Sequence, residues 1–396
     1  MVIDNNPTET AAYTQKILRL AEWISGSGIR VSSGEDRGAL YAWIEKPSDG
    51  PLFLYSEATG YLISMINNLR QFSEEPGWTR MALEAGDWLV SVAQHESGLV
   101  LGRKYSSPSK DIFSFENRHV ALFDNCIAGY GLMNLFAMTG KEKYLRHALR
   151  IADACLDAFF DEDFRLLGPV FSIDGRAIRT QQDHWSAHSG SFLLKCALFF
   201  VSASKKSQDP RLSQAVDTLL KLALERQLAD GRFLTNRAAE ETHLHPHCYT
   251  IEGLLFLAHE FQRADLLDHA KLAIDFAFRV CMSQPDEIVH SWPTTDNYCG
   301  AALRSDAIVQ SLRAYYIVKL LDDSYAPDWE GQVDGLVTII DSFGLASGGT
   351  SYGRSGDGLL IEHANSWCHI FRVEMEIFRY HYLRRSGLPG SYLFIA

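Results

Sequence analysis

The residues best suited to chemistry lie in the stretch THLHPHCYTIEGLLFLAHE, residues 242–260. His247, Tyr249 and Glu252 stand where an apolar, helix-like run begins. A helix dipole disfavours the cationic form of a histidine at the helix N-terminus, so His247 is expected to be a neutral base near neutral pH. Tyr249 can exchange a proton with a sugar oxygen, and Glu252 can act as acid, base or orienting group. This combination suits proton transfer on a polyhydroxylated substrate.

A second polar helix start, QQDHWSAHSG at residues 181–190, adds His188 as another base and Asp183 as an acid, base or orienting group. The predicted catalytic set is therefore His247, His188, Asp183, Tyr249 and Glu252. His243 and His245 flank a loop that Pro246 biases toward an extended conformation, so both are expected to be exposed and without a role.

Other polar and aromatic residues at predicted helix starts are expected to bind the substrate. They are Glu57, Asp124, His184, Trp185, Trp292, Asn297, Arg304, Asp306, His363 and Trp367. The tryptophans offer flat apolar faces for sugar rings, and Arg304, with Arg354 and Arg372 behind it, could hold the carboxylate of a uronic acid. Acidic residues in a first turn also cap helices, which is an alternative explanation for Glu57, Asp124 and Asp183.

Amphipathic segments that could position these residues run along the whole chain. The first predicted helix is 9–24, and the last is 363–384. Between them lie the pairs 57–70 and 78–94, 124–139 and 142–159, 183–204 and 210–227, 247–262 and 264–281, 299–322 and 328–343. The first member of each pair is apolar nearly all round, whereas the second has a charged face, which predicts inner and outer helices respectively.

The predicted inner helices repeat a small residue, at Gly60, Gly129, Gly190, Gly253, Ser305 and Ser366. This order of helices resembles the (α/α)6 toroid, and the turns QHESG at 94 and QLADGRF at 227 resemble the Gln-to-Gly turns of toroid families. The resemblance implies an all-α fold in which residues 1–396 form one toroid domain. Its N-terminal helix would pair with its C-terminal helix to close the ring.

In such a toroid the N-terminal ends of the inner helices meet at one face, so the six polar helix starts would line a common funnel. The resemblance points to six-hairpin glycoside hydrolases, unsaturated glucuronyl hydrolases, polysaccharide lyases and N-acylglucosamine 2-epimerases, and PLFLYSEATGYLI at 51–63 resembles toroid proteins associated with exopolysaccharide biosynthesis. It implies a bacterial enzyme that acts on a sugar or oligosaccharide by acid/base chemistry, without a cofactor. Hydrolysis, elimination and epimerisation all stay open.

Three other functions stay open: a zinc enzyme, a terpene-cyclase-like enzyme and a non-catalytic glycan-binding protein. Cys299, Cys368 and His369 resemble the zinc ligands of lanthionine cyclases, and Asp296, Cys299 and His363 resemble those of protein prenyltransferases. A terpene-cyclase-like enzyme would need an Asp-x-Asp-Asp motif, which the acid clusters near 161 and 321 do not supply. A non-catalytic glycan-binding protein would use the same aromatic and polar funnel without turnover.

Composition narrows the range of partners. The formal net charge is −12 without a strongly basic run, which argues against nucleic acid as a partner. The N-terminal residues lack the pattern of a targeting segment, and no apolar stretch is long enough for membrane insertion. Seven dispersed cysteines fit a reducing compartment, so a cytoplasmic location is expected.

Overall fold

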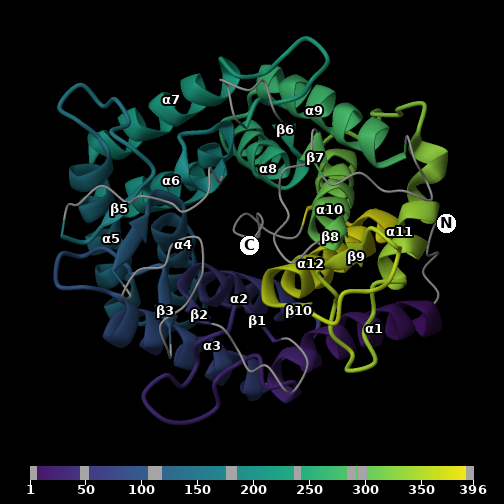
Figure 1. Cartoon of the computed structure of the whole chain (residues 1–396), viewed down its shortest axis with the longest axis horizontal. Coiled ribbons are helices and arrows are strands. Elements are labelled where there is room, and N and C mark those ends of the chain that lie inside the picture. The colour runs from purple at the N-terminus through teal and green to yellow at the C-terminus, as the bar shows by residue number, and fades with distance from the viewer. Residues whose placement is uncertain are drawn as a thin grey trace.

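The helices of the chain form a ring of two layers around a common centre (Figure 1). The computed structural model describes residues 7–44, 53–105, 118–174, 185–235, 242–282, 291–292 and 301–388. The inner layer contains α2 (Ser56–Leu69), α4 (Leu122–Thr139), α6 (Ala197–Ser207), α8 (Leu244–Glu260), α10 (Ser305–Leu321) and α12 (Ser366–Arg384). The outer layer contains α1 (Pro7–Gly26), α3 (Pro76–Trp88), α5 (Glu142–Phe159), α7 (Pro210–Leu224), α9 (Ala264–Met282) and α11 (Val333–Asp341). The predicted (α/α)6 toroid is confirmed.

The two layers differ because their sequences bury different faces. Every residue of α4 from Leu122 to Leu135 is buried, as expected of a helix that is surrounded on all sides. In its outer partner α5, burial follows one stripe that includes Tyr144, Ala148 and Ile151, and the opposite face is charged. The hydrophobic periodicity of the sequence therefore decides which helix lies inside.

The repeated small residues allow the inner helices to pack closely. A Cβ atom at Gly60 in α2 would lie 2.7 Å from the carbonyl oxygen of Ile127 in α4. A Cβ atom at Gly253 in α8 would lie 2.8 Å from the carbonyl oxygen of Leu194. Larger residues at these positions would push neighbouring inner helices apart, which explains why small residues recur there.

Short antiparallel strand pairs carry the chain into most of the inner helices. The strands are β1 (Trp43–Ile44), β2 (Phe53–Tyr55), β3 (Arg103–Tyr105), β4 (His119–Ala121), β5 (Val170–Ser172), β6 (Thr242–His243), β7 (Ser291–Trp292), β8 (Ala301–Arg304), β9 (Gly353–Ser355) and β10 (Ala364–Asn365). They pair as β1 with β10, β2 with β3, β4 with β5, β6 with β7 and β8 with β9. Since β2, β4, β6, β8 and β10 each end where an inner helix begins, these strands lie at the same end of the inner layer.

Helices α1 and α12 contact one another. Lys16 Nζ lies 2.7 Å from Glu376 Oε1, and His369 Nε2 lies 2.7 Å from the carbonyl oxygen of Leu20. The Gln-to-Gly turns link neighbouring outer helices. Gln227 Nε2 donates to the carbonyl oxygens of His269 and Gly231, at 2.9 and 3.3 Å, and Gln94 makes the corresponding bonds after η1 (Leu89–Ala93).

Several predicted helix boundaries need correction. The segment 183–204 becomes regular helix only at 197, after the 3-10 turns η2 (Trp185–Ala187) and η3 (Ser191–Cys196). The segment 299–322 contains strand β8 before α10, because its residues pair with β9. The segment 328–343 begins with the 3-10 turn η5 (Glu330–Gln332). Within the described ranges, no helix has both the length and the apolarity that crossing a membrane requires.

Candidate active site

A cavity of about 110 Å³ lies where the inner helices begin. Its lining includes Glu57 in α2, Asp124 in α4, Tyr249 in α8 and Trp367 in α12, together with Arg304 just before α10. The strands that precede the helices contribute further side chains, among them Tyr55, Arg103 and His119. Residues from the starts of several inner helices therefore line one cavity.

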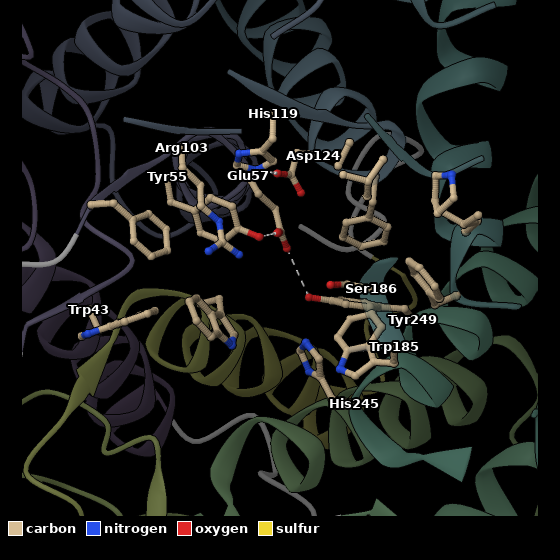
Figure 2. A pocket seen from close by; sticks show the side chains of 18 of the residues that line it. Trp43, Tyr55, Glu57, Arg103, His119, Asp124, Trp185, Ser186, His245 and Tyr249 are labelled. Carbon is tan, nitrogen blue, oxygen red and sulfur yellow. Dashed lines mark hydrogen bonds and ion pairs between the residues drawn. The ribbon is translucent and has the colours of Figure 1, made fainter. Parts of the chain in front are cut away.

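Two carboxyl groups, those of Glu57 and Asp124, face one another in the cavity (Figure 2). Burial raises the pKa of Asp124 well above its ordinary value, and the charge of Glu57 and a hydrogen bond to it raise this pKa further, while Arg103 opposes the shift. Burial also raises the pKa of Glu57, but a hydrogen bond from Tyr55 and the charge of Lys195 partly offset this effect. The pKa of Asp124 is raised more strongly than that of Glu57, so Asp124 is the carboxyl of this pair that holds a proton more readily.

Two phenols donate hydrogen bonds to Glu57 from opposite sides. The hydroxyl of Tyr55 donates to Oε2, and the hydroxyl of Tyr249 donates to Oε1 at 3.3 Å. Burial is the main cause that raises the pKa of each phenol well above its ordinary value, so both stay protonated donors at neutral pH. Two such donors stabilise the ionised form of Glu57, which supports Asp124 as the proton carrier.

His119 and Arg103 complete the side of the cavity next to Asp124. His119 Nε2 lies 3.9 Å from Asp124 Oδ2, and burial together with the charge of Arg103 lowers the pKa of His119 well below its ordinary value. His119 is therefore neutral. The Arg103 guanidinium lies 4.6 Å from the ring centroid of Phe53, and its Nη1 donates to the hydroxyl of Tyr105 at 3.2 Å.

His245 forms a second polar group on the cavity wall (Figure 2). Its Nδ1 lies 2.7 Å from Gln310 Oε1 and 3.1 Å from Asp306 Oδ2. Burial alone would raise the pKa of Asp306, but the charges of Arg304 and His245 bring it below its ordinary value. An ionised Asp306 keeps a proton on Nδ1 of His245, so Nε2 is the nitrogen of this ring that can exchange a proton with a substrate.

Aromatic side chains gather on both sides of the carboxyl pair. On one side Trp43, Phe53, Tyr55 and Trp367 contact one another, with ring centroids 5.1 to 6.2 Å apart. On the other side Phe123, Trp185, Phe192, His245 and Tyr249 form a similar group, with centroids 4.5 to 5.9 Å apart. Most of the cavity wall is therefore apolar and flat, with a few polar groups between, as in many sites that bind small molecules.

The structure places the histidines of α8 differently from expectation. His245 and His243 are buried, at 6% and 5% exposure, so the prediction that they are exposed is wrong. His247 lies away from the cavity: its Nδ1 accepts from the backbone N–H of Phe233 at 3.2 Å, and its Nε2 lies 3.0 Å from the carbonyl oxygen of Ala273. Residues two apart on a helix point about 200° apart, so His245 and His247 cannot share a face.

Of the other predicted catalytic residues, Tyr249 lines the cavity, whereas His188 is exposed and does not. Glu252 is fully buried behind the site, where Lys195 and Arg313 bind its two oxygens. Asp183 lies outside the described residues. The catalytic set proposed from sequence is therefore not assembled as one constellation in the described part of the chain.

The residues predicted to bind the substrate lie in several places. Glu57, Asp124, Trp185, Arg304 and Trp367 line the cavity. Asp306 lies behind them and binds Arg304, with Arg304 Nη2 at 2.6 Å from Oδ2. His363 is buried with its ring against Trp43 and Tyr352, at centroid distances of 4.9 and 5.4 Å. His184, Asn297 and the side chain of Trp292 lie outside the described residues.

The described residues give no support to the zinc alternatives. No group of three or more His, Cys, Asp or Glu side chains among them could hold a metal ion. Both ring nitrogens of His369 are engaged in the fold, Nδ1 with Thr350 Oγ1 at 3.0 Å and Nε2 with Leu20, and burial raises the pKa of the Cys368 thiol well above its ordinary value. Asp296 and Cys299 lie outside the described residues.

Several cavity residues were missed from sequence because they precede the helices. Phe53, Tyr55 and Glu57 alternate along β2 into α2, and His119 and Ala121 alternate along β4. Alternate residues of a strand share a face, so a period of two just before each inner helix was the signal that could have identified them. Arg103 and Trp43 lie on strands that the helical pattern does not reveal.

No protein-family model matches the sequence, and a search of curated proteins finds no match. Solved structures resemble the fold over nearly its whole length. A sugar epimerase from a ruminal bacterium is 10% identical with a TM-score of 0.68, covering 92% of this chain and 98% of its own. A D-mannose isomerase is 11% identical with a TM-score of 0.68, covering 94% and 98%. An unsaturated glucuronyl hydrolase specific for heparin is 11% identical with a TM-score of 0.62, covering 95% and 98%. At such low identity the likeness is one of fold, and it establishes the (α/α)6 toroid.

Proposed function

We propose that the chain is a carbohydrate-active enzyme that hydrolyses a glycosidic bond, with Glu57 and Asp124 as its acid/base pair. The observation that carries this proposal is a pair of buried carboxyl groups with raised pKa values in a cavity walled by aromatic rings. In the proposal, these two carboxyls share one proton. Perturbed, mutually coupled carboxyls in a concave site are a common mark of catalytic acids and bases. Several proteins of the same fold act on sugars, which supports the choice of substrate class.

The pair is expected to act as one unit from one side of the substrate. The two carboxyls face one another, and the charge of Glu57 raises the pKa of Asp124 (Figure 2). We therefore expect them to lie closer together than the roughly 5 to 9.5 Å that separates the two carboxyls of most glycosidases. Asp124 donates its proton to the oxygen of the bond that breaks, and water adds to the sugar carbon. Glu57 takes the proton that this water loses, so the pair ends with one proton, as it began.

The cavity also suggests which sugars bind. Its flat walls suit the apolar faces of sugar rings, and Trp43 and Trp185 lie on opposite sides of the carboxyl pair (Figure 2). Arg103 and Arg304 both line the cavity, and we expect the Arg103 guanidinium to contact the carboxylate of an acidic sugar. Loss of preference for uronides over the matching neutral glycosides in Arg103→Gln would support this expectation, and an unchanged preference would contradict it.

A second candidate is epimerisation or isomerisation of a free sugar. The oriented His245–Asp306 pair favours it, because the basic Nε2 could remove a proton from carbon next to a carbonyl group. The two candidates differ in a measurable way. Epimerisation breaks a C–H bond and exchanges its hydrogen with solvent, whereas hydrolysis leaves all carbon-bound hydrogens in place.

Proton NMR of reactions in D₂O tests both candidates at once. Disaccharides, aryl glycosides, uronides and free aldoses are each incubated with the protein. Hydrolysis gives new anomeric signals without loss of carbon-bound hydrogen, and epimerisation removes the signal of the hydrogen next to the carbonyl carbon. We expect hydrolysis of at least one glycoside, while exchange in free aldoses that His245→Asn abolishes would favour the second candidate.

Variants then connect turnover with the carboxyl pair. Asp124→Asn and Glu57→Gln should each lower kcat by about 10²- to 10⁴-fold, as expected for loss of a general acid or base. Asp268→Asn is the matched control, since the Asp268 side chain is 73% exposed on α9. Wild-type turnover in both cavity variants would contradict the proposal. Saccharide binding without any turnover by the wild type would indicate a glycan-binding protein.

A further inference from the structure

A fully buried lysine, Lys195, lies behind the carboxyl pair in η3. Its Nζ lies 4.6 Å from the ring centroid of Tyr249 and 4.7 Å from that of Tyr61. Nζ also lies 2.7 Å from Glu252 Oε2. A desolvated cation so close to aromatic rings interacts more strongly with them than one at the surface.

Lys195 belongs to a network of buried charges contributed by several inner helices. Arg313 of α10 binds both Glu252 of α8 and Glu374 of α12, and Glu374 Oε1 accepts from Asn68 Nδ2 of α2 at 3.1 Å. All four charged side chains are fully buried, and their two positive and two negative charges balance. Such a network holds Lys195 at a defined position, because moving any charge would leave another unpaired.

The network reaches the carboxyl pair through Tyr249. This residue receives Lys195 at its ring and donates its hydroxyl to Glu57 Oε1 at 3.3 Å. A cation at a phenol ring draws electron density from the hydroxyl oxygen, which makes the O–H group a stronger donor. The positive charge of Lys195 also favours the ionised form of Glu57 directly.

We infer that Lys195 is a positioning residue that acts through Tyr249 to keep Glu57 ionised, so that Asp124 carries the shared proton. The inference rests on the proposed function of the Glu57–Asp124 pair. Lys195 itself does not line the cavity and is not expected to touch the substrate.

Titratable and charged groups from several elements surround Glu57 and Lys195. Glu57 is faced by Tyr55 from β2, Tyr61 from its own helix, Tyr249 from α8 and Asp124 from α4. Lys195 is faced by Tyr61, Tyr249, Glu252, Arg313 and Glu374. Arg103 and His119 lie on the Asp124 side, and the pKa of His119 is too low for it to carry charge at neutral pH. Among these groups, Lys195 is the cation in contact with the Tyr249 ring.

The contacts from Lys195 through Tyr249 to Glu57 predict that enzyme activity falls at alkaline pH. Burial lowers the pKa of Lys195 to about 8, and the charge of Glu252 opposes this shift. Lys195 is therefore charged below about pH 8 and loses its charge as the pH rises through that value. Once the cation is lost, the proton is divided more evenly between the two carboxyls, and the fraction of molecules in the productive arrangement falls.

The test compares pH profiles of kcat/KM for the wild type, Lys195→Arg and Lys195→Met on a glycoside that the wild type hydrolyses. The wild type should lose activity above about pH 8. Arginine stays charged, so Lys195→Arg should keep its activity to a pH at least one unit higher. In Lys195→Met, kcat/KM should be roughly tenfold lower at neutral pH, the factor that corresponds to a change of about one in the pKa of a carboxyl of the pair. Its kcat/KM should not show the alkaline decline of the wild type. Lys319→Met, which removes a lysine paired with Glu330 at 3.1 Å outside the site, is the control.

A measurement without substrate separates this inference from the proposed function. The infrared band of a protonated buried carboxyl is followed against pH in the same proteins. In Lys195→Met the band should persist to a higher pH than in the wild type, because the pair has lost a cation that opposed protonation. The inference is overturned if Lys195→Arg loses activity near pH 8, as the wild type is expected to do. It is also overturned if the infrared band of Lys195→Met is lost at the same pH as that of the wild type. Failure of the proposed function would appear instead as wild-type turnover in Asp124→Asn and Glu57→Gln.

Discussion

Gly102 offers a way to displace the carboxyl pair without changing its chemistry. This residue lies just before β3, and a Cβ atom there would lie 2.4 Å from Asp124 Oδ2 and 2.5 Å from His119 Nε2. Ordinary contacts begin at 3.4 Å, so Gly102→Ala must move the Asp124 carboxyl by about 1 Å, and a misplacement of that size can lower a rate by roughly 10²-fold. We expect kcat of the alanine variant to fall by about that factor.

The assay is kcat and KM on the hydrolysed glycoside, together with thermal unfolding followed by circular dichroism. Gly335→Ala is the control, since a Cβ atom at Gly335 in α11 meets nothing within 4 Å. Alanine in place of glycine in a helix should leave the rate unchanged and stabilise the fold by about 0.8 to 1 kcal/mol. A Gly102→Ala enzyme with wild-type kcat and an intact fold would contradict this prediction, because it would show that the position of the Asp124 carboxyl does not limit catalysis.

Three further predictions concern stability and metal. The raised pKa of Asp124 means that the folded protein binds a proton that the unfolded chain releases, so stability falls as the pH rises above the ordinary carboxyl range. Asp124→Asn should therefore be more stable than the wild type at neutral pH and equally stable in strong acid, as measured by urea unfolding at several pH values. His247→Ala should cost about 2 to 4 kcal/mol of unfolding free energy, because the backbone groups of Phe233 and Ala273 lose their partner, yet kcat per folded molecule should not change. A chelator should alter neither kcat nor melting temperature, and loss of either together with stoichiometric zinc would favour the zinc alternatives.

The ring architecture could be predicted from sequence because it depends on periodicity. Apolar residues all round a segment mark an inner helix, one apolar stripe marks an outer helix, and recurring small residues such as Gly60 and Gly253 mark where inner helices touch. The two Gln-to-Gly turns were also recognisable. Short strands were harder to predict, since two or three residues carry too little pattern to separate them from the helices that follow.

The site was only partly predictable because its geometry depends on where each helix begins. Helix α8 starts at Leu244 rather than at 247, and Pro246 is tolerated in its first turn, where the missing N–H has no helical partner. This start turns His245 and Tyr249, four residues apart, to the cavity and directs His247 toward α9. The depth of Lys195 depends on packing between helices, which no local pattern in the sequence reveals.

A crystal structure of the Asp124→Asn variant, with a glycoside that the wild type hydrolyses bound intact, would show most directly whether Asp124 and Glu57 act on the glycosidic bond. We expect the glycosidic oxygen to lie within hydrogen-bond distance of residue 124, Glu57 to lie close enough to accept a proton from water, and the sugar ring to lie against the aromatic wall. A glycoside that binds outside this cavity, or whose glycosidic oxygen lies beyond reach of both residues, would contradict it.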